Sequence, residues 1–134
     1  MSRHEVWQPE APSLVGQELV EAEQGTTPSV IHCWADWNQT DRDADAVIRS
    51  LRTRMSGWVN FYSCNVDMPD NSAWLAGHQC VSIPCFYVFR KGKMLKRIVG
   101  QRNEITLARD LLDAIAQDAH PRPRGWFRYF RGTP

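Results

Sequence analysis

The chain has 134 residues, enough for one domain with a core of its own. Its 43% hydrophobic and 23% charged residues are ordinary for a soluble globular protein, and a net charge of +1 argues against a global field that attracts nucleic acid. No apolar run approaches the roughly 20 residues of a transmembrane helix, and the first residues lack the apolar segment of a secretory signal. We therefore expect no transmembrane segment and a cytoplasmic location, with an organelle matrix, as a subunit of a complex, as the alternative.

The first twelve residues are polar and contain proline, so we interpret residues 1–12 as an N-terminal arm whose Trp7 is available to a partner. Residues 13–119 carry the periodic patterns of a folded domain. Leu14, Leu19 and Ala22 have the spacing of a short amphipathic helix, with Ser13 as its candidate N-cap. The sequence Gly-Thr-Thr-Pro at residues 25–28 ends this helix.

Residues 29–34 form a short apolar run typical of a strand buried on both faces. Thr40 and Asp41 are candidate caps for the helix that follows, and Gly57 ends it. The apolar stripe of this helix consists of Ala44, Val47, Ile48, Leu51 and Met55.

Residues 59–66 and 85–89 are predicted as the second and third strands, with a short helix around residues 73–75 between them. Lys91-Gly92 is a hairpin signal, so residues 93–99 return as a fourth strand. Asn103 caps a last helix, whose apolar stripe is Ile105, Ala108, Leu111, Leu112 and Ile115. A strand–helix–strand start requires a parallel pair, and the hairpin requires an antiparallel pair. The sequence therefore predicts an α/β domain with a mixed four-stranded sheet flanked by helices.

Five short motifs in this order resemble the thioredoxin family over residues 29–117. They are Trp-Ala-Asp-Trp at 34–37, Asn-Val-Asp at 65–67, Ser-Ile-Pro at 82–84, Phe-Arg-Lys-Gly at 89–92 and Val-Gly at 99–100. The resemblance implies a thioredoxin-like fold and makes Pro84 the family's cis-proline. In that family the backbone at the cis-proline pairs with an incoming peptide, so Pro84, Ile83 and Trp37 become candidates for a peptide groove. The alternative is that the sheet geometry alone requires Pro84.

The chain departs from the family where the redox cysteines belong. Asn38, Gln39, Thr40 and Asp41 stand at the Cys-Gly-Pro-Cys positions. Thioredoxin chemistry needs an attacking thiolate and a resolving thiol at that loop, and this sequence supplies neither. By the same resemblance, His32 stands in place of the family's buried Asp, and Ser63 in place of its strand Lys. The degenerate loop favours a protein that is not an enzyme.

The four cysteines, Cys33, Cys64, Cys80 and Cys85, include no Cys-x-x-Cys pair, and we interpret them first as buried packing thiols. A second hypothesis is that Cys85 and His32 form a reactive thiol–imidazole pair, with Cys80 as a further catalytic candidate. A Cys80–Cys85 disulfide is also open. His78 with Cys80 and Cys85 matches no standard zinc spacing, so we expect no metal and no cofactor.

The composition changes at residues 120–134, where arginines alternate with aromatic residues. A disordered end, a nucleic-acid contact, a membrane contact and a docking tail are all open. We favour a docking tail for a protein partner, because four arginines without a basic domain argue against nucleic acid. The candidate contact residues are Trp126, Phe127, Arg128, Tyr129 and Phe130.

The leading functional hypothesis is a redox-inactive thioredoxin-like protein that acts as an interaction module or as an accessory subunit of a larger assembly. The alternative is an atypical thiol–disulfide oxidoreductase or redox sensor that uses Cys85, with or without Cys80. A third hypothesis is a chaperone that binds unfolded chains in the groove at Pro84 and Trp37. Fold alone does not choose among them, because function depends on the site.

Overall fold

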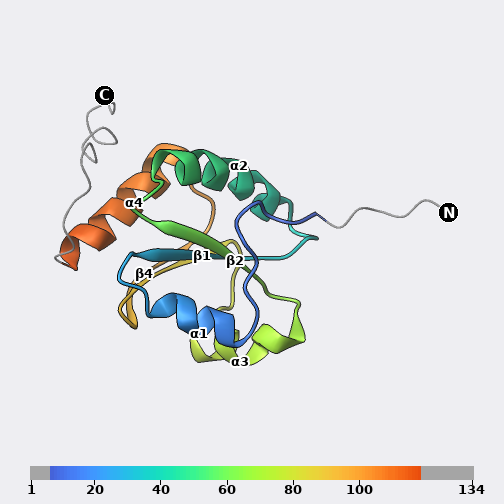
Figure 1. The fold of residues 1–134 in the computed structure, drawn as a ribbon. Helices are drawn as coiled ribbons and strands as arrows, with labels where there is room; N and C mark the ends of the chain where they lie inside the picture. The colour runs from blue at the N-terminus through green and yellow to red at the C-terminus, as the bar shows by residue number, and fades with distance from the viewer. Residues whose placement is uncertain (1–6, 119–134) are drawn as a thin grey trace.

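A four-stranded mixed sheet forms the centre of the domain in the computed structural model, which describes residues 7–118 (Figure 1). Its strands are β1 (Ser29–Trp34), β2 (Asn60–Asn65), β3 (Cys85–Arg90) and β4 (Lys93–Val99), in the order β2-β1-β3-β4. The β1–β2 pair is parallel, and the β1–β3 and β3–β4 pairs are antiparallel. The predicted mixed sheet and its hairpin are therefore confirmed.

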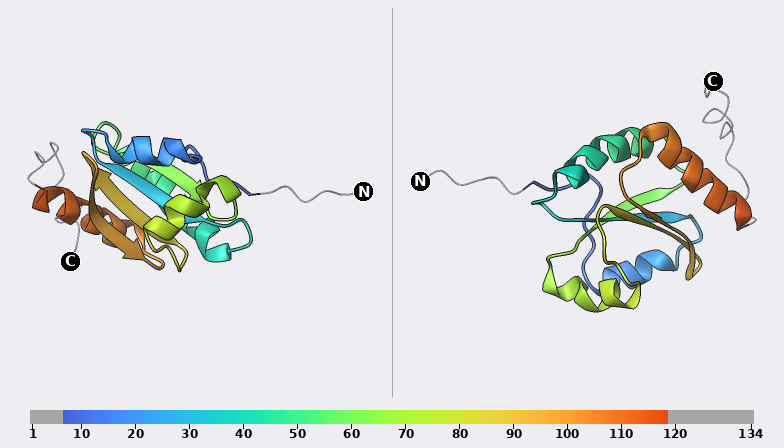
Figure 2. Two further views of the ribbon diagram at one scale, coloured as in Figure 1. Left: turned by 90° about the horizontal axis from the view of Figure 1, so that it is seen from below. Right: turned by 180° about the vertical axis from the view of Figure 1, so that it is seen from behind.

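Helices cover both faces of the sheet (Figures 1 and 2). On one side α2 (Gln39–Arg54) and α4 (Glu104–Gln117) pack on alternate strand residues such as Val30, Phe86 and Ile98. On the other side lie α1 (Gln17–Glu23), the 3-10 turn η1 (Pro69–Asn71) and α3 (Ser72–Gly77), against Ile31, Cys33 and Tyr87. Because successive strand residues point to opposite faces, neighbours in sequence belong to different cores. No helix among residues 7–118 is long and apolar enough to cross a bilayer.

Three details of the predicted helices are wrong. Helix α1 has Gly16 at its N-cap position instead of Ser13, because Ser13 bridges to Ser63 on β2. Helix α2 is capped by Asn38, ahead of the expected Thr40 and Asp41. In α4 the cap Asn103 is confirmed, but Ile105 is 45% exposed and Leu107 takes its place in the core.

The segment before α1, from residue 7, lies against the domain. The backbone N–H of Ser63 donates to the Pro12 carbonyl at 2.8 Å, and the N–H of Leu14 donates to the Ser63 carbonyl at 2.9 Å. Trp7, which we expected to reach a partner, packs edge-on against Trp34 with the ring centroids 5.1 Å apart. These contacts place residues 12–14 along the outer edge of β2 and Trp7 against the end of β1.

The β3–β4 hairpin turns at Lys91 and Gly92, which have φ values of 52° and 78°. Two consecutive positive φ values are the geometry of a type I′ turn, which explains the glycine. The N–H groups of Lys91 and Gly92 donate to the carbonyls of Gly25 and Glu23. The hairpin tip is thereby fixed to the end of α1, and β4 is held in register beside β3.

Candidate functional site

The loop at the start of α2 is built from polar side chains that hold the backbone. Asn38 accepts a hydrogen bond from the Thr40 N–H through Oδ1 at 3.1 Å and donates from Nδ2 to the Ile83 carbonyl at 3.3 Å. Gln39 is exposed and donates to Asp43 at 3.0 Å. Asn38 thus joins the helix N-terminus to the loop before Pro84, at the position where the sequence resemblance expects an attacking cysteine.

Asn38→Ala should lower the free energy of unfolding by about 1 kcal/mol, because the first turn of α2 loses its side-chain cap. Asn38→Asp is the matched control, since a carboxylate oxygen still caps the helix and only the bond to Ile83 is lost. Urea unfolding followed by tryptophan fluorescence measures both variants. Equal stability of Asn38→Ala and the parent would contradict this role.

Asp41 and His32 form a buried pair beneath the same loop. His32 Nε2 lies 3.0 Å from Asp41 Oδ1, and the two side chains are 1% and 0% exposed. The tautomer with its hydrogen on Nε2 makes this bond. Asp41 Oδ2 accepts from the Ala35 N–H at 3.1 Å. A buried charge requires such partners, so Asp41 stabilises the loop and has no access to a substrate.

His32 has no thiol beside it. In the β1–β3 register His32 is opposite Phe86, with which it stacks at 4.9 Å, and Cys33 is opposite Cys85. His32 and Cys85 therefore point to opposite faces of the sheet. The hypothesis of a reactive Cys85–His32 pair is wrong. Ser63, opposite His32 on β2, donates its hydroxyl to the Ala11 carbonyl at 2.9 Å.

An open apolar pocket of about 190 Å³ lies beside the loop before Pro84. Two exposed residues flank this pocket. Trp37 is 68% exposed and donates its indole N–H to Asp67 at 2.8 Å, and Val81 is 91% exposed. The Ile83–Pro84 peptide bond is cis, as the resemblance implies. The pocket is lined by Trp37, Val66, Cys80, Val81, Ser82 and Ile83. The predicted groove residues Trp37 and Ile83 are thus brought together.

All four cysteines lie on the α1–α3 side of the sheet. Cys64, Cys33 and Cys85 are in register on β2, β1 and β3, and they form a row across three adjacent strands. Cys80 lies over this row, partly exposed, where a second pocket of about 250 Å³ contains both Cys80 and Cys85. All four thiols are free, and no cluster of potential metal ligands occurs among residues 7–118.

The thiols differ in their protonation. Hydrogen bonds from Cys33 and Cys85, together with the positive charge of Arg97, lower the pKa of Cys80 to about 3. Interaction with Cys80, together with burial, raises the pKa of Cys85 well above its usual value. The Tyr87 hydroxyl beside this cluster donates its hydrogen to the His78 carbonyl at 2.9 Å. The lowered pKa of Cys80 and the raised pKa of Cys85 therefore favour ionisation at the more accessible of the two sulfurs.

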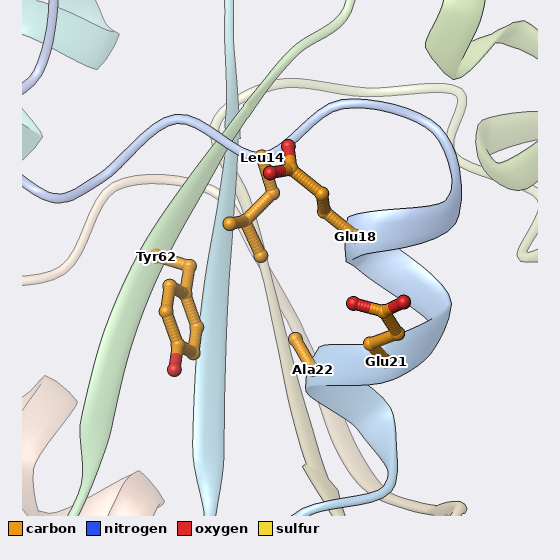
Figure 3. Close-up of a pocket in the computed structure, with 5 residues that line it drawn as sticks. All are labelled: Leu14, Glu18, Glu21, Ala22 and Tyr62. Atoms are coloured by element: carbon orange, nitrogen blue, oxygen red, sulfur yellow. The ribbon is translucent and has the colours of Figure 1, made fainter.

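A larger pocket of about 270 Å³ lies away from this region, between α1 and β2 (Figure 3). Leu14, Ala22 and Tyr62 line it together with Glu18 and Glu21, whose carboxylates are exposed. Glu18 also accepts from the Val15 N–H at 2.8 Å. The residues that line this depression include no thiol, hydroxyl nucleophile of Ser or Thr, or histidine, so we take the region around Pro84 as the candidate site.

Comparisons with known proteins agree with this geometry. The sequence model of the thioredoxin family matches residues 17–113. The chain belongs to the thioredoxin family. A thioredoxin of Mycolicibacterium smegmatis is 30% identical over 88 residues, which cover 66% of this chain and 79% of that protein. A thioredoxin of Mycobacterium bovis is 27% identical over 88 residues and is covered to 74%.

Solved structures of thioredoxins have the same fold. Mitochondrial thioredoxin 3 of Saccharomyces cerevisiae, in its oxidised form, superposes with a TM-score of 0.68 at 19% identity. The superposition covers 77% of this chain and 94% of that one. A chain from a study of thiol resolution in a yeast mitochondrial 1-Cys peroxiredoxin gives a TM-score of 0.69 at 19% identity, over 78% and 95% of the two chains. The fold is therefore a thioredoxin fold, within which this member has polar residues at the redox loop.

Sequence reasoning missed two features of this thioredoxin-like site. One is the His32–Asp41 pair. The sequence feature that could have predicted it is that His32 replaces the family's buried Asp while Asp41 replaces its second cysteine, so that a base and an acid stand at two neighbouring positions. The other is the gathering of Cys33 and Cys64 with Cys80 and Cys85, which depends on strand register. The proposed tail contacts, Trp126, Phe127, Arg128, Tyr129 and Phe130, lie outside the described residues.

Proposed function

We propose that this protein is a polypeptide-binding module that uses the groove beside Pro84 and does not perform the thioredoxin Cys-x-x-Cys reaction. The observation that carries the proposal is the contrast within one loop region. The groove residues Trp37 and Val81 are exposed, whereas the positions of the redox cysteines hold an interior hydrogen-bonding network. Binding surface and fold are retained, and the sulfur at that loop is absent.

The loop before Pro84 offers backbone groups to an extended chain. Within residues 7–118, the Ile83 N–H has no hydrogen-bond partner, and the Ile83 carbonyl accepts from the Asn38 side chain alone. Extended peptides bind to such free main-chain groups, with their side chains in adjacent pockets. Trp37 is suited to one of those pockets because large aromatic residues dominate binding energy at interfaces. Such a surface would serve this protein equally as a chaperone for unfolded chains or as a subunit that docks one partner.

Trp37→Ala should weaken binding of an extended, cysteine-free polypeptide about 30-fold, as the loss of a central aromatic contact worth about 2 kcal/mol implies. The probe is reduced and carboxymethylated insulin B chain, titrated into the full-length protein by NMR. We expect shifts at the Trp37 indole and at Val81 and Ile83. Trp58→Phe, on the opposite side at the end of α2, is the control. Shifts confined to residues away from the groove would contradict the proposal.

Thiol–disulfide exchange is a second candidate, favoured by the free thiols of Cys80 and Cys85 at the groove. It requires the sulfur that reacts to be Cys80, because Cys85 is only 1% exposed. A cytoplasmic location, or an organelle matrix, fits either function, since free thiols persist in reducing compartments. Docking of an assembly partner through residues 120–134 is also part of the proposal. The test is to compare the proteins that copurify with the full-length chain and with a chain that lacks residues 120–134.

A further inference from the structure

The groove contains a thiol cluster that the missing Cys-x-x-Cys loop does not account for. Cys80 and Cys85 line one pocket with Gln79, Val81, Ser82 and Arg97, directly before and after the cis-Pro84 loop. Cys80 shares the neighbouring pocket with Trp37 and Ile83, where an extended polypeptide would lie. A partly exposed sulfur at the binding surface therefore shares a pocket with a second, buried sulfur.

We propose that Cys80 and Cys85 form a relocated dithiol pair, in which Cys80 attacks a disulfide of a polypeptide bound in the groove and Cys85 resolves the mixed disulfide. This inference rests on the proposed groove and names its partner class, a cystine-containing polypeptide. It reverses the roles of the earlier hypothesis, in which Cys85 was the leading thiol.

Accessibility decides which thiol attacks first. Cys80 is partly exposed, and Cys33, Cys64 and Cys85 are buried with at most 1% exposure. Arg97 on β4 is opposite Tyr87 in register, so it lies on the cysteine face of the sheet, and within residues 7–118 it has no carboxylate partner. Its charge is free to stabilise a thiolate at Cys80. The groups that face this thiolate are Cys33 of β1, Cys85 and Tyr87 of β3, and Arg97 of β4.

The opposite pKa shifts of the two thiols that share the pocket order the two steps. While Cys80 carries the negative charge, its proximity and burial keep the pKa of Cys85 raised, so Cys85 remains protonated. Once Cys80 has entered a mixed disulfide, that charge is gone, and with it the main cause of the raised pKa of Cys85. The pKa of Cys85 is then lower than before, and Cys85 lines the same pocket as the Cys80 sulfur that it attacks.

The atoms balance as follows. The Cys80 thiolate forms a bond to one sulfur of the partner disulfide, and the second partner sulfur leaves as a thiolate that takes a proton from water. Cys85 gives its proton to solvent and attacks Cys80 Sγ, which forms the Cys80–Cys85 bond and releases the first partner sulfur as a thiol. The partner disulfide gains two electrons, and the Cys80–Cys85 pair loses two.

The test uses the reduced full-length protein with 5,5′-dithiobis(2-nitrobenzoic acid), an aromatic disulfide whose released thiol is coloured. The parent should release two equivalents and contain a Cys80–Cys85 bridge by peptide mapping. Cys85→Ala should release one equivalent and retain the label on Cys80. In Cys80→Ser the initial rate of thiol release should be at least tenfold lower than in the parent. The control Cys64→Ala should release the thiol at the initial rate of the parent.

The pH dependence of the first step is a second readout. Between pH 5 and pH 8 the rate at which Cys80 attacks the aromatic disulfide should change less than about twofold. Over the same range an ordinary peptide thiol with a pKa of about 8.5 reacts roughly 700-fold faster at the upper pH, because its thiolate fraction rises. A Cys80 rate that rises as steeply as that of the peptide thiol would overturn the assignment of the attacking group. An unchanged initial rate in Cys80→Ser would also overturn it, as would a disulfide bridge from Cys80 to Cys33 in the parent.

Two probes of the parent separate this inference from the proposed groove. The carboxymethylated insulin B chain has no thiol or disulfide and reports binding alone, whereas a cystine-linked peptide should also form a mixed disulfide with Cys80. If binding persists and exchange is absent from the parent, the dithiol inference is wrong and the groove stands. If exchange occurs with small disulfides and binding is absent, the groove is wrong.

Discussion

Asp41→Ala should destabilise the domain by about 3–5 kcal/mol. The substitution leaves His32 buried beside Phe86 without its partner and removes the acceptor of the Ala35 N–H. Breaking one side of a buried, hydrogen-bonded pair costs this much because the remaining polar group stays desolvated. The measurement is the free energy of unfolding in urea. A loss below about 1 kcal/mol would contradict a structural role for the pair.

Asp43→Ala is the matched control, since Asp43 is an exposed carboxylate in the same turn of α2 that accepts a hydrogen bond from Gln39. We expect a change within about 0.5 kcal/mol for that surface site. The double variant His32→Leu/Asp41→Leu should recover part of the stability lost in Asp41→Ala, because it leaves no unpaired imidazole. A coupling energy near zero between the two positions would show that their contact contributes nothing.

Restoring the redox loop should create thioredoxin activity. The variant His32→Asp/Asn38→Cys/Asp41→Cys, built on Cys80→Ser, should reduce insulin with dithiothreitol at least about tenfold faster than Cys80→Ser alone. A cysteine at position 38 would lie at the N-terminus of the 16-residue helix α2, where the helix dipole favours the thiolate. The assay follows the turbidity of the reduced insulin chains.

The single variant Asn38→Cys, also on Cys80→Ser, separates attack from turnover. It has an attacking thiol and retains Asp41, so it should accumulate a mixed disulfide and not turn over. A folded triple variant with no activity would show that the groove no longer accepts thioredoxin substrates. That outcome would count against the proposed binding function, and it leaves the Cys80–Cys85 exchange to its own test.

The sequence was sufficient for the order of strands and for the caps and turns that depend on local chemistry. Asn103 and the Lys91-Gly92 hairpin lie as predicted, because a cap or a tight turn needs only neighbouring residues. Ser13 was predicted as a helix cap, because its β-bridge partner Ser63 is fifty residues away in the sequence. The helix and strand propensities of neighbouring residues carry no information about such distant pairing.

The candidate site was predictable where it repeated a motif and not where it depended on register. Trp37 and Ile83 meet in the groove, as the resemblance implied. His32 and Cys85 were expected to meet because they lie on adjacent strands, but a shift of one residue between β1 and β3 decides which face each side chain occupies. That register also aligns Cys33 with Cys85, which no spacing in the sequence reveals.

The chain before α1 has a consequence for how copies of this protein behave at high concentration. Pro12 and Leu14 occupy the hydrogen-bonding groups of Ser63 at the β2 edge, so a strand from another copy meets an edge that is already paired there. The opposite edge, β4, carries Lys93, Lys96 and Arg97. Paired or positively charged edges oppose strand-to-strand aggregation. Within residues 7–118 the domain therefore resists self-association through its sheet, while the loop before Pro84 stays open to other chains.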